Sequence, residues 1–412
     1  MEWLDPTFVK SLVEEDSLSL SNLSSYLQAC YPDEKGLSTA NLRKFCKRHS
    51  IVLSQHPEST SQEALDGAVS AAVDDVGGTY GRRMMTAYLR NKGIFAAEER
   101  VGSSLKRVSP QYHEHREAGT QKQLNPQSYY APYFGYNLHM DQNEKLVEFG
   151  ITFVIAVDGS SGFIPSFAVM PKKNNLIIYD ELFRSAVEKY SLWEQIVVDQ
   201  GREFYLTLFI QEYLRQADCV NRPAYRQVKS TMNNRVERMW VEVNQRVGYP
   251  IKSCLIDMVN AGLVDMDDDC HLFGVSQVGM MVARCGLSTF IDTWNQHSVP
   301  GKGRPSDAVQ SRQNIQLSVA VPTAEEAKTM YETASGKLGP IQTTAGADLL
   351  ESSQQLQECR TKTFKDQMEN QIGSLTFIFG ATANNRYEPL QNAIKLYINI
   401  TQSLSNSVLC NT

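Results

Sequence analysis

The sequence lacks a long apolar run, a signal peptide and a closely spaced cysteine pair. A bilayer-spanning helix needs roughly 20 consecutive apolar residues, and no apolar run of this 412-residue chain reaches that length. The opening residues MEWLDPTFVKSLVEED are acidic, without the basic start and apolar middle of a signal peptide. The eight cysteines are scattered without a CxxC pair, which argues against a zinc site. We therefore expect an intracellular protein with no membrane partner.

A general excess of positive charge is also lacking, because the formal net charge is -6. That balance argues against a protein coated in basic residues, but local patches matter more than the total for binding to nucleic acids. Residues 79–122 carry nine Lys or Arg against four Glu, whereas residues 321–412 carry seven basic and nine acidic side chains. The basic character is therefore concentrated in the N-terminal third of the chain.

What is present is enough apolar material for two or three globular domains, since hydrophobic residues make up 42% of the chain. The composition and the spacing of apolar residues change along the sequence and predict five segments. They are a helical region at 1–56, a second helical region at 57–108, a polar linker at 109–132, a core of strands and helices at 133–310, and an unassigned region at 311–412.

The two N-terminal regions predict short helices joined by turns. In the first, a basic helix follows Ser38, so a helix-turn-helix and a small bundle with a solvated charged face both remain open. In the second, Thr60 and Glu63 form a capping-box pattern, and three helices are expected, to about residue 76, at 80–91 and at 97–108. The last of these exposes side chains suited to DNA phosphates and base edges: Arg100, Lys106 and Arg107.

The core segment predicts β-strands that end in carboxylates. YFGYNLHMDQ is a short strand ending at Asp141, and two β-rich runs follow, joined by a hairpin at residues 158–162. EQIVVDQGREF is a buried strand ending at Asp199, and NNRVERMWVEVNQRV is an amphipathic helix that carries Glu237. We interpret Asp158 as a turn residue and His139 as structural.

This order of motifs resembles the retroviral-type integrases and the related DDE transposases. The resemblance rests on LHMDQ, IAVDGSSGFI, VVDQGREF and NNRVERMW, and it covers residues 130–250. It extends to TYGRRMMTAYLRNKG and RVGSSLKRV, which look like a transposase helix-turn-helix, and to WNQHSVPGKGRP, which looks like the segment that closes such cores. The resemblance implies an α/β core of the ribonuclease H-like fold behind an all-α helix-turn-helix region.

The resemblance also implies the catalytic residues, which match the family's motifs at Asp141, Asp199 and Glu237. The spacing of 37 residues between the second and third is close to that of the family. The three carboxylates are expected to bind two Mg²⁺ or Mn²⁺ ions, with Asp141 bridging both. The implied activity is that of a polynucleotidyl transferase that cleaves DNA and joins its strands.

The expected partner is double-stranded DNA, and joining two ends implies at least a homodimer. Basic side chains flank the carboxylates in the sequence and are predicted to hold DNA phosphates: Lys172, Lys173, Arg226, Lys229, Arg235 and Arg238. In a eukaryotic host the protein is expected in the nucleus.

Two alternatives stay open. One is a domesticated, non-catalytic DNA-binding protein that retains the integrase fold, and the other is a ribonuclease H-type nuclease acting on RNA–DNA hybrids. The chain also departs from retroviral integrases in having no legible small basic β-barrel at its C-terminus.

Overall fold

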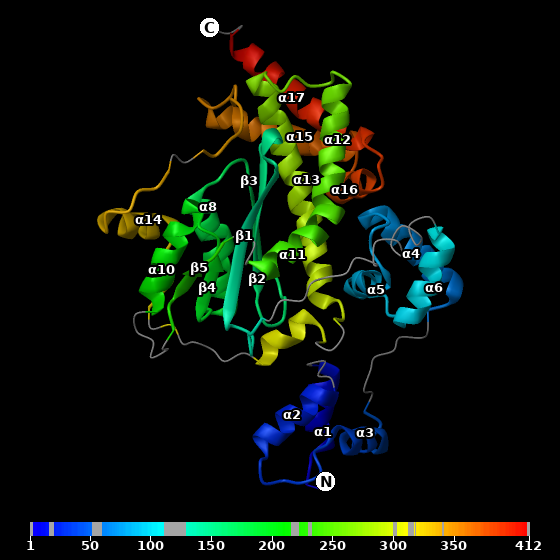
Figure 1. Cartoon of the computed structure of the whole chain (residues 1–412). Helices are drawn as coiled ribbons and strands as arrows, with labels where there is room; N and C mark the ends of the chain where they lie inside the picture. Colours follow the sequence, from blue (N-terminus) through cyan, green and yellow to red (C-terminus); the bar gives the residue numbers. More distant parts are fainter. Residues whose placement is uncertain are drawn as a thin grey trace. The chain divides into compact units, whose positions relative to one another are not determined.

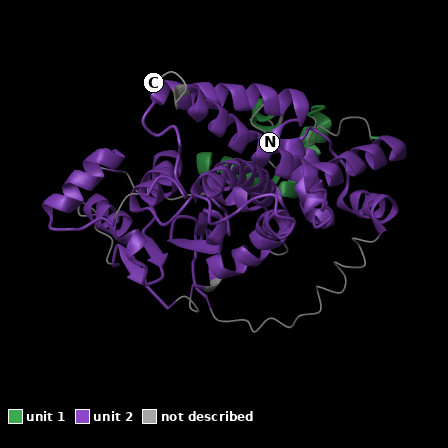
Figure 2. Ribbon diagram, turned by 90° about the horizontal axis from the view of Figure 1, so that it is seen from above, with its two compact units in different colours: residues 1–61 green, residues 62–412 purple. Residues whose placement is uncertain are grey.

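The chain divides into two compact units, residues 1–61 and residues 62–412, which Figure 2 shows in different colours. The computed structural model describes residues 3–15, 20–51, 60–110, 129–215, 222–229, 233–299, 303–311, 317, 319–339 and 342–409. Most of the predicted linker, residues 111–128, therefore lies outside the described residues. None of the helices in the described ranges combines the length and apolar character needed to span a bilayer.

The smaller unit is helical, as predicted. Its elements are α1 (Pro6–Lys10), the π-helix η1 (Ser11–Glu15), α2 (Leu20–Cys30) and α3 (Thr39–Arg48). Ser38 caps α3 by accepting the Asn41 backbone N–H, and Leu23, Leu27 and Leu42 pack in a small core of their own. The helices of this region are confirmed, and their role in DNA binding stays a prediction.

The larger unit is built around a five-stranded mixed sheet (Figure 1). The strands are β1 (Asn137–Leu146), β2 (Ile151–Asp158), β3 (Ser166–Met170), β4 (Gln195–Val198) and β5 (Tyr225–Gln227), in the order β3-β2-β1-β4-β5. β1 pairs antiparallel with β2, and β2 with β3, whereas β4 runs parallel to β1 and β5 runs parallel to β4. The sheet therefore places β1, which carries Asp141, next to β4, which Asp199 directly follows.

Asp141 lies in the middle of β1, so the prediction that the first strand ends at this residue is wrong. β1 continues to Leu146 because residues beyond Asp141 still pair with β2. The parallel pairing with β4, in contrast, is described only for residues 137–139, with His139 opposite Val197. Asp141 therefore lies beyond the part of β1 that β4 covers.

The short strand β5 is a further element that the sequence pattern does not predict. Its bonds to β4 are made across more than twenty residues of sequence, which local patterns do not reveal. Residues 216–221 and 230–232 lie outside the described part of the chain.

Both faces of the sheet are covered, which explains why every residue of β2 is buried. Successive side chains alternate between the faces. Leu138, Met140, Val154 and Ala156 face one core, which is completed by α8 (Asn175–Ile177), the π-helix η3 (Ile178–Arg184), α9 (Ser185–Tyr190), the 3-10 helix η4 (Arg202–Phe204) and α10 (Tyr205–Arg215). α14 (Ala324–Thr333) packs on α10.

The opposite face of the sheet packs on a thick helical layer. It contains α11 (Asn234–Val243), the π-helix η6 (Asn244–Gly248), α12 (Tyr249–Asn260) and the long α13 (Asp269–Gln296), followed by the 3-10 helix η7 (Pro305–Ser311). The predicted N-terminal helices α4 (Gln62–Val76), α5 (Arg82–Asn91) and α6 (Glu98–Val108) share this core. So do α15 (Gln354–Gln371), α16 (Leu375–Ala383) and α17 (Glu388–Leu409).

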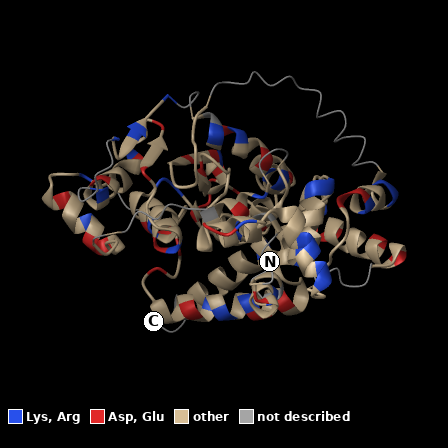
Figure 3. Ribbon diagram, turned by 90° about the horizontal axis from the view of Figure 1, so that it is seen from below, with Lys and Arg blue, Asp and Glu red and all other residues tan. Residues whose placement is uncertain are grey.

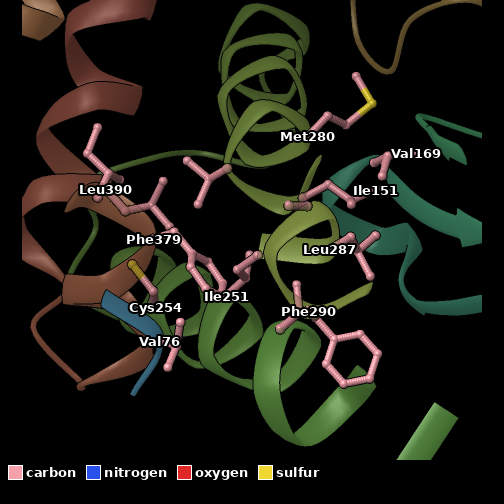
Figure 4. Close-up of a cluster of buried hydrophobic side chains, with 14 of the residues drawn as sticks. Val76, Ile151, Val169, Ile251, Cys254, Met280, Leu287, Phe290, Phe379 and Leu390 are labelled. Carbon is pink, nitrogen blue, oxygen red and sulfur yellow. The ribbon is translucent and has the colours of Figure 1, made fainter. Parts of the chain in front are cut away.

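α13 is the element on which these distant segments meet. Figure 4 shows Leu287 and Phe290 of α13 between sheet residues such as Ile151 and side chains of α12, α16 and α17. A Cβ on Gly380 of α16 would collide with backbone oxygens of α4, so only glycine permits this helix approach. The C-terminal helices, whose role the sequence left open, thus cover α13 and fasten the N-terminal helices to the core.

Candidate functional site

Two predicted carboxylates lie next to each other at the end of the parallel pair β1 and β4. His139 of β1 pairs with Val197 of β4, so Asp141 follows two residues later on β1, and Asp199 follows two residues later, directly after β4 ends at Val198. Because side chains alternate along a strand, both point away from the core that contains Met140 and Val198, toward the α11 side of the sheet. The Gly201 backbone N–H donates to Asp199 Oδ1 at 3.1 Å and so orients this carboxylate in its turn.

The third predicted carboxylate, Glu237, lies in the first turn of α11, which contacts β1 and β2. The buried side chains Val236, Trp240 and Val243 dock this helix on the layer above the sheet. The predicted apolar face of α11 is thereby confirmed. The packing places Glu237 on the side of the sheet toward which Asp141 and Asp199 point.

The carboxyl of Asp141 is buried and lies within reach of the negative charges of the other two carboxylates. Asp141 is only 7% exposed, and its pKa is raised to about 7, chiefly because burial disfavours the charged form. The negative charges of Glu237 and Asp199 raise the pKa further, whereas the hydrogen bond from the Trp240 indole lowers it. The structure thus brings all three predicted residues to one site.

Trp240 makes the most direct contact with this trio. Its indole Nε1–H donates to Asp141 Oδ2 at 2.9 Å, and both side chains are buried. The sequence pattern marks this tryptophan only as part of the apolar helix face. A buried indole N–H usually finds a hydrogen-bond acceptor, but the sequence does not show that the acceptor is Asp141, 99 residues earlier.

The donor chemistry of the trio suits a divalent cation. Three carboxylates supply hard oxygen ligands of the kind Mg²⁺ and Mn²⁺ prefer, and their mutual repulsion is the kind that a cation relieves. Within the described ranges, however, no three His, Cys, Asp or Glu side chains converge closely enough to enclose a metal ion. The carboxylates are therefore adjacent but not gathered around one point.

A buried polar network lies next to the trio. His139 Nε2 is 2.7 Å from the Tyr129 hydroxyl, and His139 Nδ1 is 2.6 Å from Asn233 Oδ1. The Asn233 side-chain N–H donates to the Met140 carbonyl oxygen at 3.3 Å. Burial lowers the pKa of His139 to about 4, so the ring is neutral at pH 7. The structural interpretation of His139 agrees with these contacts, whereas Asn233 was not singled out from the sequence.

The basic residues predicted near the carboxylates have different environments. Lys173 pairs with Glu144 at 3.4 Å and Glu203 at 3.5 Å, and the guanidinium of Arg235 lies 4.3 Å from the centre of the Tyr129 ring. The remaining four side chains are exposed: Lys172, Arg226, Lys229 and Arg238. Arg226 lies on β5, and Arg235 and Arg238 lie on α11, whereas the three lysines follow the ends of β3 and β5. The contacts of all six with DNA stay a prediction.

The basic residues of α6 lie apart from this group. Arg107 pairs with Asp66 of α4 at 2.8 Å, which holds its charge within the helical region, whereas Lys106 is exposed and Arg100 is half-buried. α6 lies on the outer side of the helical layer, away from the sheet (Figure 1). Figure 3 shows Lys and Arg interspersed with Asp and Glu along the ribbon.

Two other motif residues have structural roles. Asp158 accepts hydrogen bonds from the Ser160, Ser161 and Gly135 backbones and from the Trp193 indole, in accord with its interpretation as a turn residue. Glu242, on the same helix as Glu237, instead pairs with Arg246 one turn away.

The W-N-x-H segment supports the β2–β3 hairpin. The Asn295 side chain donates to the carbonyl of Ile164 and accepts its N–H, both at 2.9 Å. The Trp294 indole donates to the Gly162 carbonyl at 2.9 Å. This motif therefore secures the sheet edge from the end of α13.

Comparisons with known proteins give one match to a family model and several similar solved structures. The family model described as "Integrase core domain" matches residues 129–312. One similar solved structure is the HTLV-2 integrase catalytic core domain in complex with magnesium in its trimeric form, with 14% identity and a TM-score of 0.27, covering 43% of this chain and 99% of that chain. Another is the simian T-cell lymphotropic virus intasome in complex with the PP2A regulatory subunit B56 gamma, with 14% identity and a TM-score of 0.29, covering 57% and 74%. No curated protein matches the sequence.

Proposed function

We propose that the protein is a transposon-derived integrase that cleaves DNA and transfers its strands, because residues 129–312 match the family model of an integrase core domain and contain a five-stranded mixed sheet. The observation that carries the proposal is the parallel pairing of β1 with β4, which brings Asp141 next to the turn that holds Asp199, while α11, which carries Glu237, contacts β1. Asp141 on β1, Asp199 directly after β4 and Glu237 on α11, each within its own sequence motif, supply the carboxylates that metal-dependent phosphodiester chemistry uses.

Asp141, Asp199 and Glu237 would hold two Mg²⁺ or Mn²⁺ ions in this proposal. Such ions activate the attacking oxygen and stabilise the leaving oxygen of a phosphodiester. The chain's own contribution is orientation. Asp141 is fixed by strand pairing and by the Trp240 indole, and Asp199 is oriented by the Gly201 N–H. Glu237, on a helix rather than a strand, supplies the third carboxylate from above the sheet.

Double-stranded DNA is the proposed partner. The exposed side chains Lys172, Arg226, Lys229 and Arg238 belong to the segments around the carboxylates and would neutralise phosphates there. Lys106 on α6 would contact DNA farther from the chemistry. Joining two ends takes two active sites, so we propose at least a homodimer, located in the nucleus of a eukaryotic host.

A strand-transfer assay tests the proposal. Duplexes ending in candidate terminal repeats are incubated with the full chain and Mg²⁺ or Mn²⁺. Joined products should require the metal and should fall at least 100-fold in Asp199→Asn and Glu237→Gln. Glu242→Gln, a carboxylate change on the same helix that faces Arg246, should retain activity. Activity that survives Asp199→Asn refutes the proposal.

One observation favours a second candidate, a domesticated DNA-binding protein without catalysis. The acidic side chains of the described residues do not converge into a metal-enclosing group. This candidate predicts tight, sequence-selective DNA binding that needs no divalent metal, together with no cleavage in Mg²⁺ or Mn²⁺. The same assay, combined with a binding titration, separates the two.

A further inference from the structure

The helix that carries Glu237 is attached to the strand that carries Asp141 at two points. At one, the Trp240 indole N–H donates to Asp141 Oδ2 at 2.9 Å. At the other, the Asn233 side chain donates to the Met140 carbonyl at 3.3 Å and lies 2.6 Å from His139 Nδ1. Asn233 lies at the N-cap of α11, four residues before Glu237, and Trp240 comes three residues after Glu237, so the two attachments lie on either side of Glu237 along the chain.

We propose that Asn233 and Trp240 are positioning residues that fasten α11 to β1 on either side of Glu237 and so hold the Glu237 and Asp141 carboxylates at one metal site. This inference rests on the proposed function and adds to it the residues that set the geometry of the site. Neither residue is proposed to touch substrate or metal.

The Asn233 attachment has a defined direction. Because its side-chain N–H is used on the Met140 carbonyl, its Oδ1 faces His139 and accepts the Nδ1–H. His139 Nε2 is then the acceptor for the Tyr129 hydroxyl, which itself accepts the Asn137 side-chain N–H at 3.3 Å. Every donor in this network therefore meets an acceptor. The network connects the N-terminus of α11 to β1 next to Asp141.

The Asn233 position explains why this tie is specific. Asn233 stands at the N-cap position of α11, where asparagine ordinarily accepts a backbone N–H of the first helical turn. No such capping bond is made here. Its side chain is instead 1% exposed and directed to β1. Asn233 therefore bonds to β1 and not to the first turn of its own helix, and this bond fixes α11 relative to β1.

The Trp240 attachment acts on the carboxylate itself. A hydrogen bond from a neutral donor to a buried carboxylate is charge-assisted and directional. It engages Oδ2 of Asp141 and so restricts the rotation of this carboxylate. Residues that orient metal ligands in this way typically change metal affinity 10–100-fold when they are replaced.

A Mn²⁺ titration of the full chain by calorimetry tests the inference. Trp240→Phe, which retains an aromatic ring but loses the N–H, and Asn233→Ala should each weaken Mn²⁺ binding about 10-fold. Trp294→Phe is the matched control, because it removes an indole bond of the same 2.9 Å length at the hairpin, and its affinity should stay that of the wild type. Unchanged affinity in a folded Trp240→Phe protein overturns the inference alone, whereas a wild type that binds no Mn²⁺ overturns the proposed function as well.

A second measurement covers a Trp240→Phe protein that fails to fold. The indole N–H signals of the four tryptophans are recorded by NMR on ¹⁵N-labelled full chain. The Trp240 signal should exchange slowly with solvent, and Asp141→Asn should move it while leaving the Trp294 signal in place. A Trp240 signal that does not respond to Asp141→Asn overturns the inference.

Discussion

Replacing Asp141 with asparagine should stabilise the folded protein at neutral and alkaline pH, although it should abolish catalysis. The carboxyl is 7% exposed and lies near two further acidic side chains, so its negative charge is disfavoured in the folded state. Asparagine keeps a side-chain oxygen that accepts the Trp240 N–H, and it removes the charge. Most substitutions of buried polar residues destabilise a protein, so an increase in stability is a distinctive outcome.

The magnitude follows from the pKa of Asp141, which is raised from 3.8 to about 7. A difference of about 3 units corresponds to about 4 kcal/mol of differential interaction. Because the folded pKa lies above the unfolded one, the penalty is absent below pH 4, grows between pH 4 and 7, and is complete above pH 7. Structural relaxation reduces it, so we expect Asp141→Asn to gain about 2–4 kcal/mol at pH 8.

Urea unfolding of the full chain at pH 8 and at pH 4.5, followed by tryptophan fluorescence, measures this gain. The difference between mutant and wild type should be large at pH 8 and small at pH 4.5. Asp267→Asn, at an exposed loop position, serves as the control and should change little at either pH. A variant that is destabilised at pH 8, or whose gain is the same at both pH values, refutes the account of the site's electrostatics.

Three further predictions concern packing and DNA binding. Gly380→Ala should destabilise the protein by about 1–3 kcal/mol in thermal unfolding, since its Cβ would collide with α4 backbone oxygens. Gly67→Ala, with nothing within 4 Å of its Cβ, should stabilise α4 by about 0.5–1 kcal/mol. A Gly67→Ala protein less stable than the Gly380→Ala protein would contradict the helix packing. Asn295→Ala should cost about 2–3 kcal/mol by leaving both backbone groups of Ile164 without their partners, and a neutral result in urea unfolding would show that water replaces them. Lys106→Ala should weaken duplex binding uniformly across sequences and should lower by about 1 the slope of the logarithm of the binding constant against the logarithm of the salt concentration. An unchanged slope would mean that Lys106 of α6 does not contact DNA phosphates.

The features that local sequence patterns determine were predictable. Alternating apolar residues and a hairpin signal predicted β2 and β3, and a strand that runs into Asp199 predicted β4. Capping and helical periodicity predicted α4, α5 and α6 within two residues of their ends. The family resemblance was recognisable because its motifs are short and contiguous in the sequence. The match of residues 129–312 to the integrase core domain confirms it.

The features that depend on distant pairing were not predictable in this way. β1 extends past Asp141 because β2 pairs with it, and β5 exists only through its bonds to β4. The C-terminal helices share a core with helices about 300 residues earlier in the sequence, and no local pattern specifies that partner. The Trp240–Asp141 bond likewise joins residues 99 positions apart.

Anomalous diffraction from crystals of the full chain grown with Mn²⁺ would show directly whether Asp141, Asp199 and Glu237 form one metal site. We expect an anomalous peak bound by the Asp141 and Asp199 carboxylates, with Glu237 turned toward it, and loss of that peak in Asp199→Asn. A peak bound elsewhere, or one that persists unchanged in Asp199→Asn, would mean that these three residues do not form one metal site.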